Sequence, residues 1–166
     1  MRKSFSTLLL AALCIAFGAA FGTVHAAEPT TAGDRLAGAK KYYTESFITG
    51  YKVGIRLSGG KVELTPARIA AARQAIGEWL DKDMIPFLQK NGILDEWVKM
   101  QFDADVRKAN QRAAEAKSID ELGQIASELE PLLKTRYPNL YAKVSSPEGM
   151  QLMQKLQTIL MNAVTK

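Results

Sequence analysis

Three observations predict an all-α protein, a helical bundle of about five helices. Apolar residues recur at helical spacing in about five segments of the chain. Helix-start signals precede three of them, at Thr65-Pro66, at Ser118 with Glu121 three residues later, and at Ser146-Pro147. Strand-type alternation is confined to Val62-Glu63-Leu64, which is too short for a strand.

The N-terminal residues 1–26 have the pattern of a secretory signal peptide. Arg2 and Lys3 precede an apolar run from Leu8 to Phe21, and Val24-His25-Ala26 is a cleavage site of the small-x-small type. We expect cleavage after Ala26, or alternatively after the next residue. The run is short for a transmembrane helix, and no later segment is longer without charges. The sequence therefore predicts a periplasmic or secreted protein with a flexible leader at 27–33 and one α-helical domain at 34–166.

Cleavage at this site removes the residues most often used in catalysis. Cys14 and His25 are the chain's one cysteine and one histidine, and both leave with the signal. The remaining chain has no thiolate nucleophile, imidazole base or Cys/His zinc site, so we expect no cofactor and no enzyme activity. Losing Arg2 and Lys3 from the 22 basic residues leaves 20 against 17 acidic ones, a net charge of +3. This weak excess argues against a nucleic-acid partner.

The first predicted helix runs from Asp34 to about Leu57 and carries an aromatic and glycine-rich face. Two interpretations are open, close packing of a neighbouring helix or a ligand groove. The groove would be formed by Tyr43, Phe47, Gly50, Tyr51 and Gly54. A second side of this helix holds a basic stripe, Lys41, Lys52 and Arg56, which is typical of a solvated face and alternatively of an anionic-surface contact.

Three further helices are predicted between residues 65 and 143. The second runs to about Lys90, with Pro86 kinking or ending it and Asn91-Gly92 terminating it. The third runs from about Leu94 to Ala116, with an exposed, alanine-rich later half. The fourth starts at Ser118 and is broken by Pro131.

The last predicted helix, Ser146 to Val164, has the widest apolar face and is expected to be central to the fold. Its candidate core residues are Met150, Met153, Leu156, Ile159 and Leu160. The alternative is a methionine-lined groove for an apolar ligand or a partner helix.

Three acidic pairs are the remaining candidates for chemistry: Asp81 with Asp83, Asp95 with Glu96, and Asp103 with Asp105. Oxygen ligands of this kind suit Ca²⁺, and two carboxylates can also perform glycoside hydrolysis. None has EF-hand spacing, and residues two apart on a helix do not face each other. The sequence therefore assigns no metal ligand and no catalytic residue.

The end of the chain resembles a family of exported bacterial helical proteins of unknown function. Tyr141 followed by Ser146-Pro147-Glu148-Gly149-Met150-Gln151 is similar to that family's late helix, which begins with Ser-Pro-x-Gly-Gln shortly after Phe-Tyr. The spacing after Tyr141 is longer here, and Met150 separates Gly149 from Gln151. The resemblance covers about the last 26 residues and implies an exported helical fold, with no activity.

These observations predict a periplasmic helical bundle that binds a partner or ligand rather than catalysing its conversion. The first hypothesis is a protein-interaction or chaperone-like module with a partner in the cell envelope. The second is a carrier of a small apolar or aromatic ligand. The third, a carboxylate-based hydrolase, has the least support.

Overall fold

The computed structural model describes residues 31–57, 59 and 63–165. Within these residues the chain is all-α, as predicted, and contains no strand. Its helices are α2 (Ala32–Leu57), α3 (Pro66–Trp79), the π-helical turn η1 (Leu80–Met84), α4 (Ile85–Lys90), α5 (Leu94–Phe102), α6 (Ala104–Glu115), α7 (Ile119–Arg136), α8 (Pro138–Val144) and α9 (Pro147–Thr165). Because α3, η1 and α4 are continuous, the described residues form seven helices, and the predicted count of about five is wrong.

The predicted signal peptide, residues 1–26, lies outside the described residues, as does most of the leader. Thr31 caps α2, its hydroxyl oxygen accepting from the Asp34 amide at 3.1 Å. Residues Ala32 and Gly33, predicted to belong to the leader, are therefore part of the first helix.

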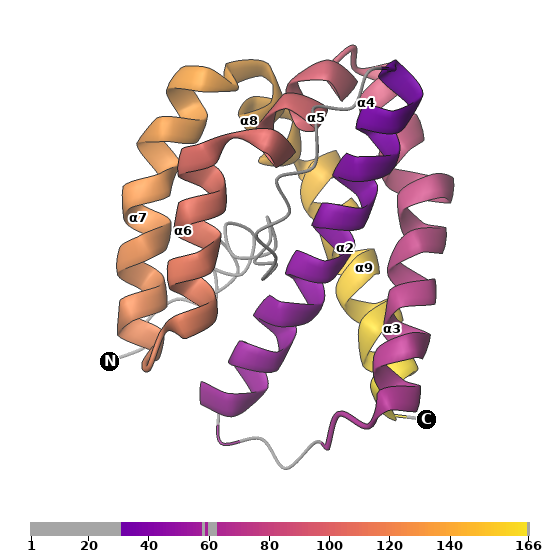
Figure 1. The fold of residues 1–166 in the computed structure, drawn as a ribbon. Coiled ribbons are helices and arrows are strands. Elements are labelled where there is room, and N and C mark those ends of the chain that lie inside the picture. Colours follow the sequence, from indigo (N-terminus) through magenta and orange to yellow (C-terminus); the bar gives the residue numbers. More distant parts are fainter. Residues whose placement is uncertain (1–30, 58, 60–62, 166) are drawn as a thin grey trace.

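Helix α2 crosses the molecule between two pairs of helices (Figure 1). On one side lie α3 and α9, which pack against each other, and on the other lie α6 and α7. The short helices α4, α5 and α8 gather at one end of the molecule. The C-terminal end of α2 leans toward the tip of the α6–α7 hairpin, away from this end.

The second predicted helix is continuous through Pro86 because its backbone widens before the proline. Proline lacks an N–H, and its ring collides with the carbonyl four residues earlier in an α-helix. The π-helical turn η1 relieves this collision, and the Ile85 amide donates to the Leu80 carbonyl, five residues back. The helix then ends as predicted at Gly92, which has a φ of 68°. The Ile93 amide donates to the Leu88 carbonyl at 2.9 Å, which completes a Schellman motif.

The third predicted helix is wrong in its continuity, because the backbone breaks at Asp103. This residue is extended, with φ −66° and ψ 124°, and its carboxylate accepts from the Asp105 and Val106 amides at 2.9 and 3.2 Å. It thereby ends α5 and caps α6. The later half is also not exposed as predicted, since one face of α6 packs against α2 and α7 through Val106, Asn110, Ala113 and Ala114.

The predicted break at Pro131 does not occur either. Pro131 is exposed and lies inside α7. Leu129 and Leu133, on either side of it, are buried in the core. Their burial outweighs the cost of about 3 kcal/mol for an interior proline. The chain turns instead at Tyr137, and Pro138 begins α8.

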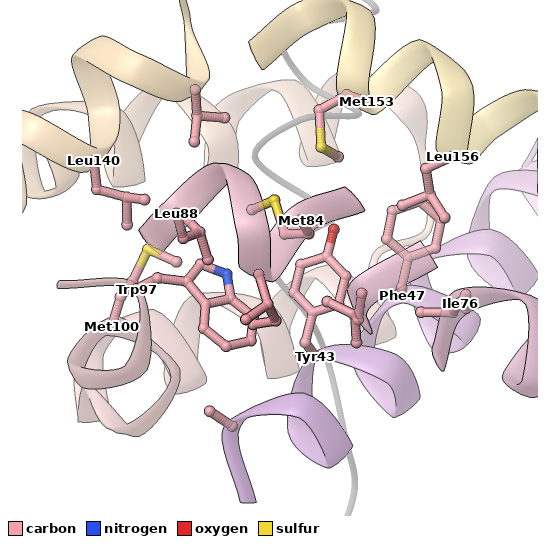
Figure 2. Packing of buried hydrophobic residues seen from close by; sticks show 14 of the residues in the cluster. Tyr43, Phe47, Ile76, Met84, Leu88, Trp97, Met100, Leu140, Met153 and Leu156 are labelled. Carbon is pink, nitrogen blue, oxygen red and sulfur yellow. The ribbon is translucent and has the colours of Figure 1, made fainter. Parts of the chain in front are cut away.

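The core consists of two clusters of buried apolar side chains. The main cluster joins residues of every described helix, and Figure 2 shows Tyr43, Phe47 and Trp97 within it. The Tyr43 ring centre lies 6.1 Å from that of Trp79 and 5.8 Å from that of Trp97. The small cluster lies between α2 and the tip of the α6–α7 hairpin. It consists of Val53, Ala113, Ala116, Leu122 and Ile125.

The last helix begins where the sequence predicts. The Ser146 hydroxyl accepts from the Gly149 amide at 3.2 Å and donates to the Lys143 carbonyl at 2.6 Å. On this helix Met153, Leu156 and Leu160 are buried in the main cluster, and Ile159 is half-buried against it. Met150, in contrast, is 36% exposed.

Candidate functional site

The aromatic residues of the predicted groove lie in the core. Tyr43 and Phe47 are buried, with ring centres 6.0 Å apart, and Figure 2 shows both rings among Met84, Ile76 and Leu156. Burial raises the pKa of the Tyr43 hydroxyl far above its usual value, so this group stays neutral. These two side chains fill the space that the groove interpretation leaves open for a ligand.

Gly54, one of the two glycines of this face, does not draw a neighbouring helix close. Gly50 is half-buried, and Gly54 is exposed. A methyl group added at Gly54 would meet no atom within 4 Å outside its own helix. At Gly54, the structure therefore supports neither close packing of a neighbouring helix nor the wall of a groove.

Tyr51, the remaining groove residue, lines a small apolar depression at the junction of α2, α3 and α9. Its lining residues are Ile48, Tyr51, Leu64, Ile69, Ala72 and Leu160. The depression has room for about one water molecule, whereas sites for drug-sized ligands enclose roughly 300–1,000 Å³. It does not have the size of a carrier site.

The three acidic pairs do not converge on a common point, because each pair binds different groups. Asp81 pairs with Lys40 of α2, and Asp83 pairs with Lys155 of α9 at 2.7 Å. Glu96 accepts from the Leu140 amide at 2.9 Å, which caps α8, while its neighbour Asp95 is exposed. Within the described residues, no three His, Cys, Asp or Glu side chains are placed to hold a metal ion.

Asp103 and Asp105 form the most highly connected polar cluster, around Arg136. The Arg136 guanidinium donates to both carboxylates, at 2.8 Å to Asp103 and 2.7 Å to Asp105. The Tyr137 hydroxyl donates to Asp103 at 2.8 Å. Burial alone would raise the pKa of Asp103, but the hydrogen bonds from Arg136, Tyr137 and two backbone amides outweigh it and hold the pKa below its usual value.

The same contacts shift the pKa of the tyrosine in the opposite direction. Burial, the hydrogen bond to Asp103 and the negative charge of that carboxylate raise the pKa of Tyr137 to about 12. Both groups therefore keep one charge state at neutral pH. The cluster joins the α5–α6 break to the α7–α8 break and has the properties of a structural clamp.

The basic stripe of α2 divides into residues with different roles. Arg56 donates to the Ala116 carbonyl at 2.6 Å, beyond the C-terminal end of α6. Lys41 and Lys52 are exposed, and both lower the pKa of Glu45, although hydrogen bonding to Arg73 of α3 is the largest cause of that shift. Glu45 and Arg73 form a bidentate ion pair at 2.7 and 2.8 Å.

Gln101 of α5 is a buried polar residue that periodicity gave no reason to single out. Its side chain is 1% exposed, and neither the nitrogen nor the oxygen of its amide has a hydrogen-bond partner in the structure. Most buried polar groups in native proteins are hydrogen-bonded. The residue lies one turn from Trp97, whose indole nitrogen is likewise buried without a partner.

The exposed apolar surface of α9 is the remaining candidate for a binding site. Met150 is 36% exposed and Met161 is 55% exposed. Their separation of eleven residues places them within about 20° of each other around the helix. Both lie at one border of the buried face of α9, so apolar surface extends outward from the core along this helix.

Comparisons with known proteins identify no relative of this chain. No protein-family profile, curated protein or solved structure shows significant similarity to this chain. The resemblance of the last helix to exported helical proteins therefore stays a prediction. None of the described helices is both long enough and apolar enough to cross a membrane.

Proposed function

We propose that this protein is an exported interaction module of the cell envelope, which holds an apolar segment of a partner protein against α9. The observation that carries this proposal is the alignment of Met150 and Met161 along one exposed line of α9. Methionine is flexible and polarisable, so it adapts to apolar partners of irregular shape. Two such side chains eleven residues apart span about 16 Å, the length of three turns of a docked helix.

The interior of the protein gives less support to the carrier hypothesis. Tyr43 and Phe47 pack in the main cluster, and the depression beside Tyr51 has room for about one water molecule. The hydrolase hypothesis requires two carboxylates that share a substrate. Asp81 and Asp83 instead form ion pairs with lysines of different helices.

A site-specific crosslinking experiment tests the binding surface. A photoreactive amino acid is placed at Met150 or Met161, with Gln151 as the control position, in cells that produce the full chain. Gln151 is also exposed on α9 but lies about 100° around the helix from Met150. We expect one crosslinked product shared by the two methionine positions and absent from the control.

Two outcomes of this experiment would contradict the proposal. One is equal crosslinking from all three positions, and the other is no product from either methionine position while the protein is folded and present. Export is tested separately by intact-mass measurement of the periplasmic fraction. We expect a chain that starts at Ala27 or Glu28, and a full-length cytoplasmic product would contradict export.

A further inference from the structure

The hairpin of α6 and α7 begins and ends at two helix breaks that touch each other. Asp103 precedes α6 and Tyr137 follows α7, and neither has helical backbone angles. The Tyr137 hydroxyl donates to the Asp103 carboxylate at 2.8 Å, and Arg136 donates to the same carboxylate. Residues Ala104–Arg136 therefore form an arm with both ends of its base at one place, which is the geometry of a hinge.

Among the described residues, the far end of the arm contacts α2 through a small apolar cluster and an arginine. Its apolar contacts form the small cluster. From α2, Val53 is buried in this cluster and Leu57 is partly buried against it. Arg56 donates to the carbonyls of Ala116 and Ala114 at 2.6 and 3.5 Å, which ties the last turn of α2 to the end of α6.

Between the small cluster and the main cluster, α6 contacts α2 through a polar pair, and the partly buried Ala109 of α6 packs against both clusters. The Asn110 amide donates to the Tyr42 hydroxyl over 3.4 Å. Segments with few buried apolar contacts open at a lower free energy than the global unfolding of a protein. The main cluster contains most of the buried apolar residues, so the tip of the arm is the weaker of the two parts.

We propose that α6 and α7 form a hinged arm that opens from α2 at its tip, with the Asp103–Arg136–Tyr137 cluster as the hinge and Arg56 as the latch. Residues near the hinge, such as Val106 and Leu133, shift little during a rotation about it and stay in the main cluster. The tip lies at the far ends of helices of 12 and 18 residues, which are about 18 and 27 Å long, and shifts most. Opening exposes the apolar side chains of the small cluster. This inference is independent of the proposed function of α9.

Thiol labelling of single cysteines in the native protein tests the arm. The full chain contains one cysteine, so Cys14→Ser provides a background without thiols. Ala113→Cys lies in the small cluster and Ala72→Cys in the main cluster, and both alanines are helical and 4% exposed. Ile125→Cys reports on α7. Each labelling rate is compared with the global unfolding rate of the same variant.

We expect the cysteines at 113 and 125 to label at least tenfold faster than the one at 72, with little dependence on low urea concentrations. Arg56→Gln removes the latch and is expected to raise the rates at 113 and 125 about tenfold, because hydrogen bonds from charged groups are among the strong ones. Arg73→Gln is the matched control, since Arg73 also ties α2 to a neighbouring helix but makes no ion pair with the arm.

Three results would contradict the proposal of a hinged arm. The first is labelling of all three cysteines at the global unfolding rate. The second is acceleration at residue 113 without acceleration at residue 125, which would show local fraying at the end of α6. The third is an equal effect of Arg56→Gln and Arg73→Gln on the rate at residue 113.

Discussion

Gly149 is the residue at which one methyl group is expected to have the largest effect. It is buried at the start of α9, where the chain turns from α8. A Cβ at this position would lie 2.4 Å from the Val144 carbonyl oxygen and 2.5 Å from that of Lys143. Contacts between carbon and a carbonyl oxygen ordinarily start near 3.3 Å, so the deficit is about 0.9 Å. The obstructing atoms belong to the backbone, which cannot turn aside as a side chain can.

The expected cost of Gly149→Ala follows from two opposing effects. Replacing a helical glycine by alanine stabilises a helix by up to about 1 kcal/mol, the full value applying to the helix interior. Overpacking costs about 1–3 kcal/mol. Moving the end of α8 also disturbs the hydrogen bond from the Ser146 hydroxyl to the Lys143 carbonyl, which contributes about 1 kcal/mol. We expect the free energy of unfolding to fall by about 2 kcal/mol.

Gly77→Ala is the matched control, because Gly77 lies within α3 and a Cβ there would meet nothing within 4 Å. We expect this variant to be more stable than the wild type by up to about 1 kcal/mol. Urea denaturation followed by circular dichroism gives both values, compared at constant m-value. A Gly149→Ala protein as stable as the Gly77→Ala protein would refute the close approach of the two helices.

Three further predictions concern the core and the polar residues within it. Leu156→Ala is expected to lower the unfolding free energy by about 2–5 kcal/mol, because Leu156 is fully buried. Lys155 is exposed, so Lys155→Ala should change the unfolding free energy by less than about 1 kcal/mol. Urea denaturation measures both values, and equal effects would contradict a central position of α9. Gln101→Met replaces a buried amide that has no hydrogen-bond partner by an apolar side chain of similar volume. We expect the unfolding free energy to rise by about 1–2 kcal/mol. A clear loss of stability would show that the amide makes hydrogen bonds in the folded protein. For Asp103, the folded pKa is below the unfolded value of about 3.9, so its stabilising contribution is present above that pH and is lost as the pH falls through the folded pKa. The stability difference between wild type and Asp103→Asn should therefore shrink from pH 7 to pH 2.5 in a series of urea titrations, and a constant difference would contradict the ionised clamp.

The helix ends that the sequence predicts correctly are those set by local hydrogen bonds. The Thr65 hydroxyl accepts from the Arg68 amide at 3.3 Å, and the Ser118 hydroxyl accepts from the Glu121 amide at 3.1 Å. Gly92 adopts the left-handed conformation that ends α4. In each case the partner lies within a few residues, so the signal is contained in a short stretch of sequence.

Two errors in the predicted helix ends occur where residues far apart in the sequence contribute to the local structure. Asp103 caps α6 through the nearby Asp105 and Val106 amides, and Arg136 and Tyr137, more than thirty residues away, also bind its carboxylate. Pro131 does not break a helix because Leu129 and Leu133 anchor the chain on both sides of it. Neither effect is visible in local periodicity. The same limit applies to the candidate site, since the partners of the acidic residues come from other helices.

Helix α2 contributes to both clusters, at different levels along its length. Tyr43 packs in the main cluster, and Val53 packs in the small one. Ten residues separate them, which places Val53 about 80° around the helix from Tyr43. The buried face of α2 therefore rotates along its length as the helix passes from one cluster to the other.

The groove hypothesis rests on the aromatic residues of α2 beside Gly50 and Gly54, where side chains are missing. In the structure, Tyr43 and Phe47 are covered by the main cluster, and Val53, further along the helix, is covered by the small one. Gly54 is exposed; it lies about 20° around the helix from Tyr43 but beyond the last α2 residue that packs on the main cluster, and about 100° from Val53. A broad apolar face on a long helix thus indicates a change of neighbour along its length as well as a binding site. Following the buried positions along the helix distinguishes the two, because a groove leaves its apolar wall exposed, whereas a change of neighbour buries each part in turn.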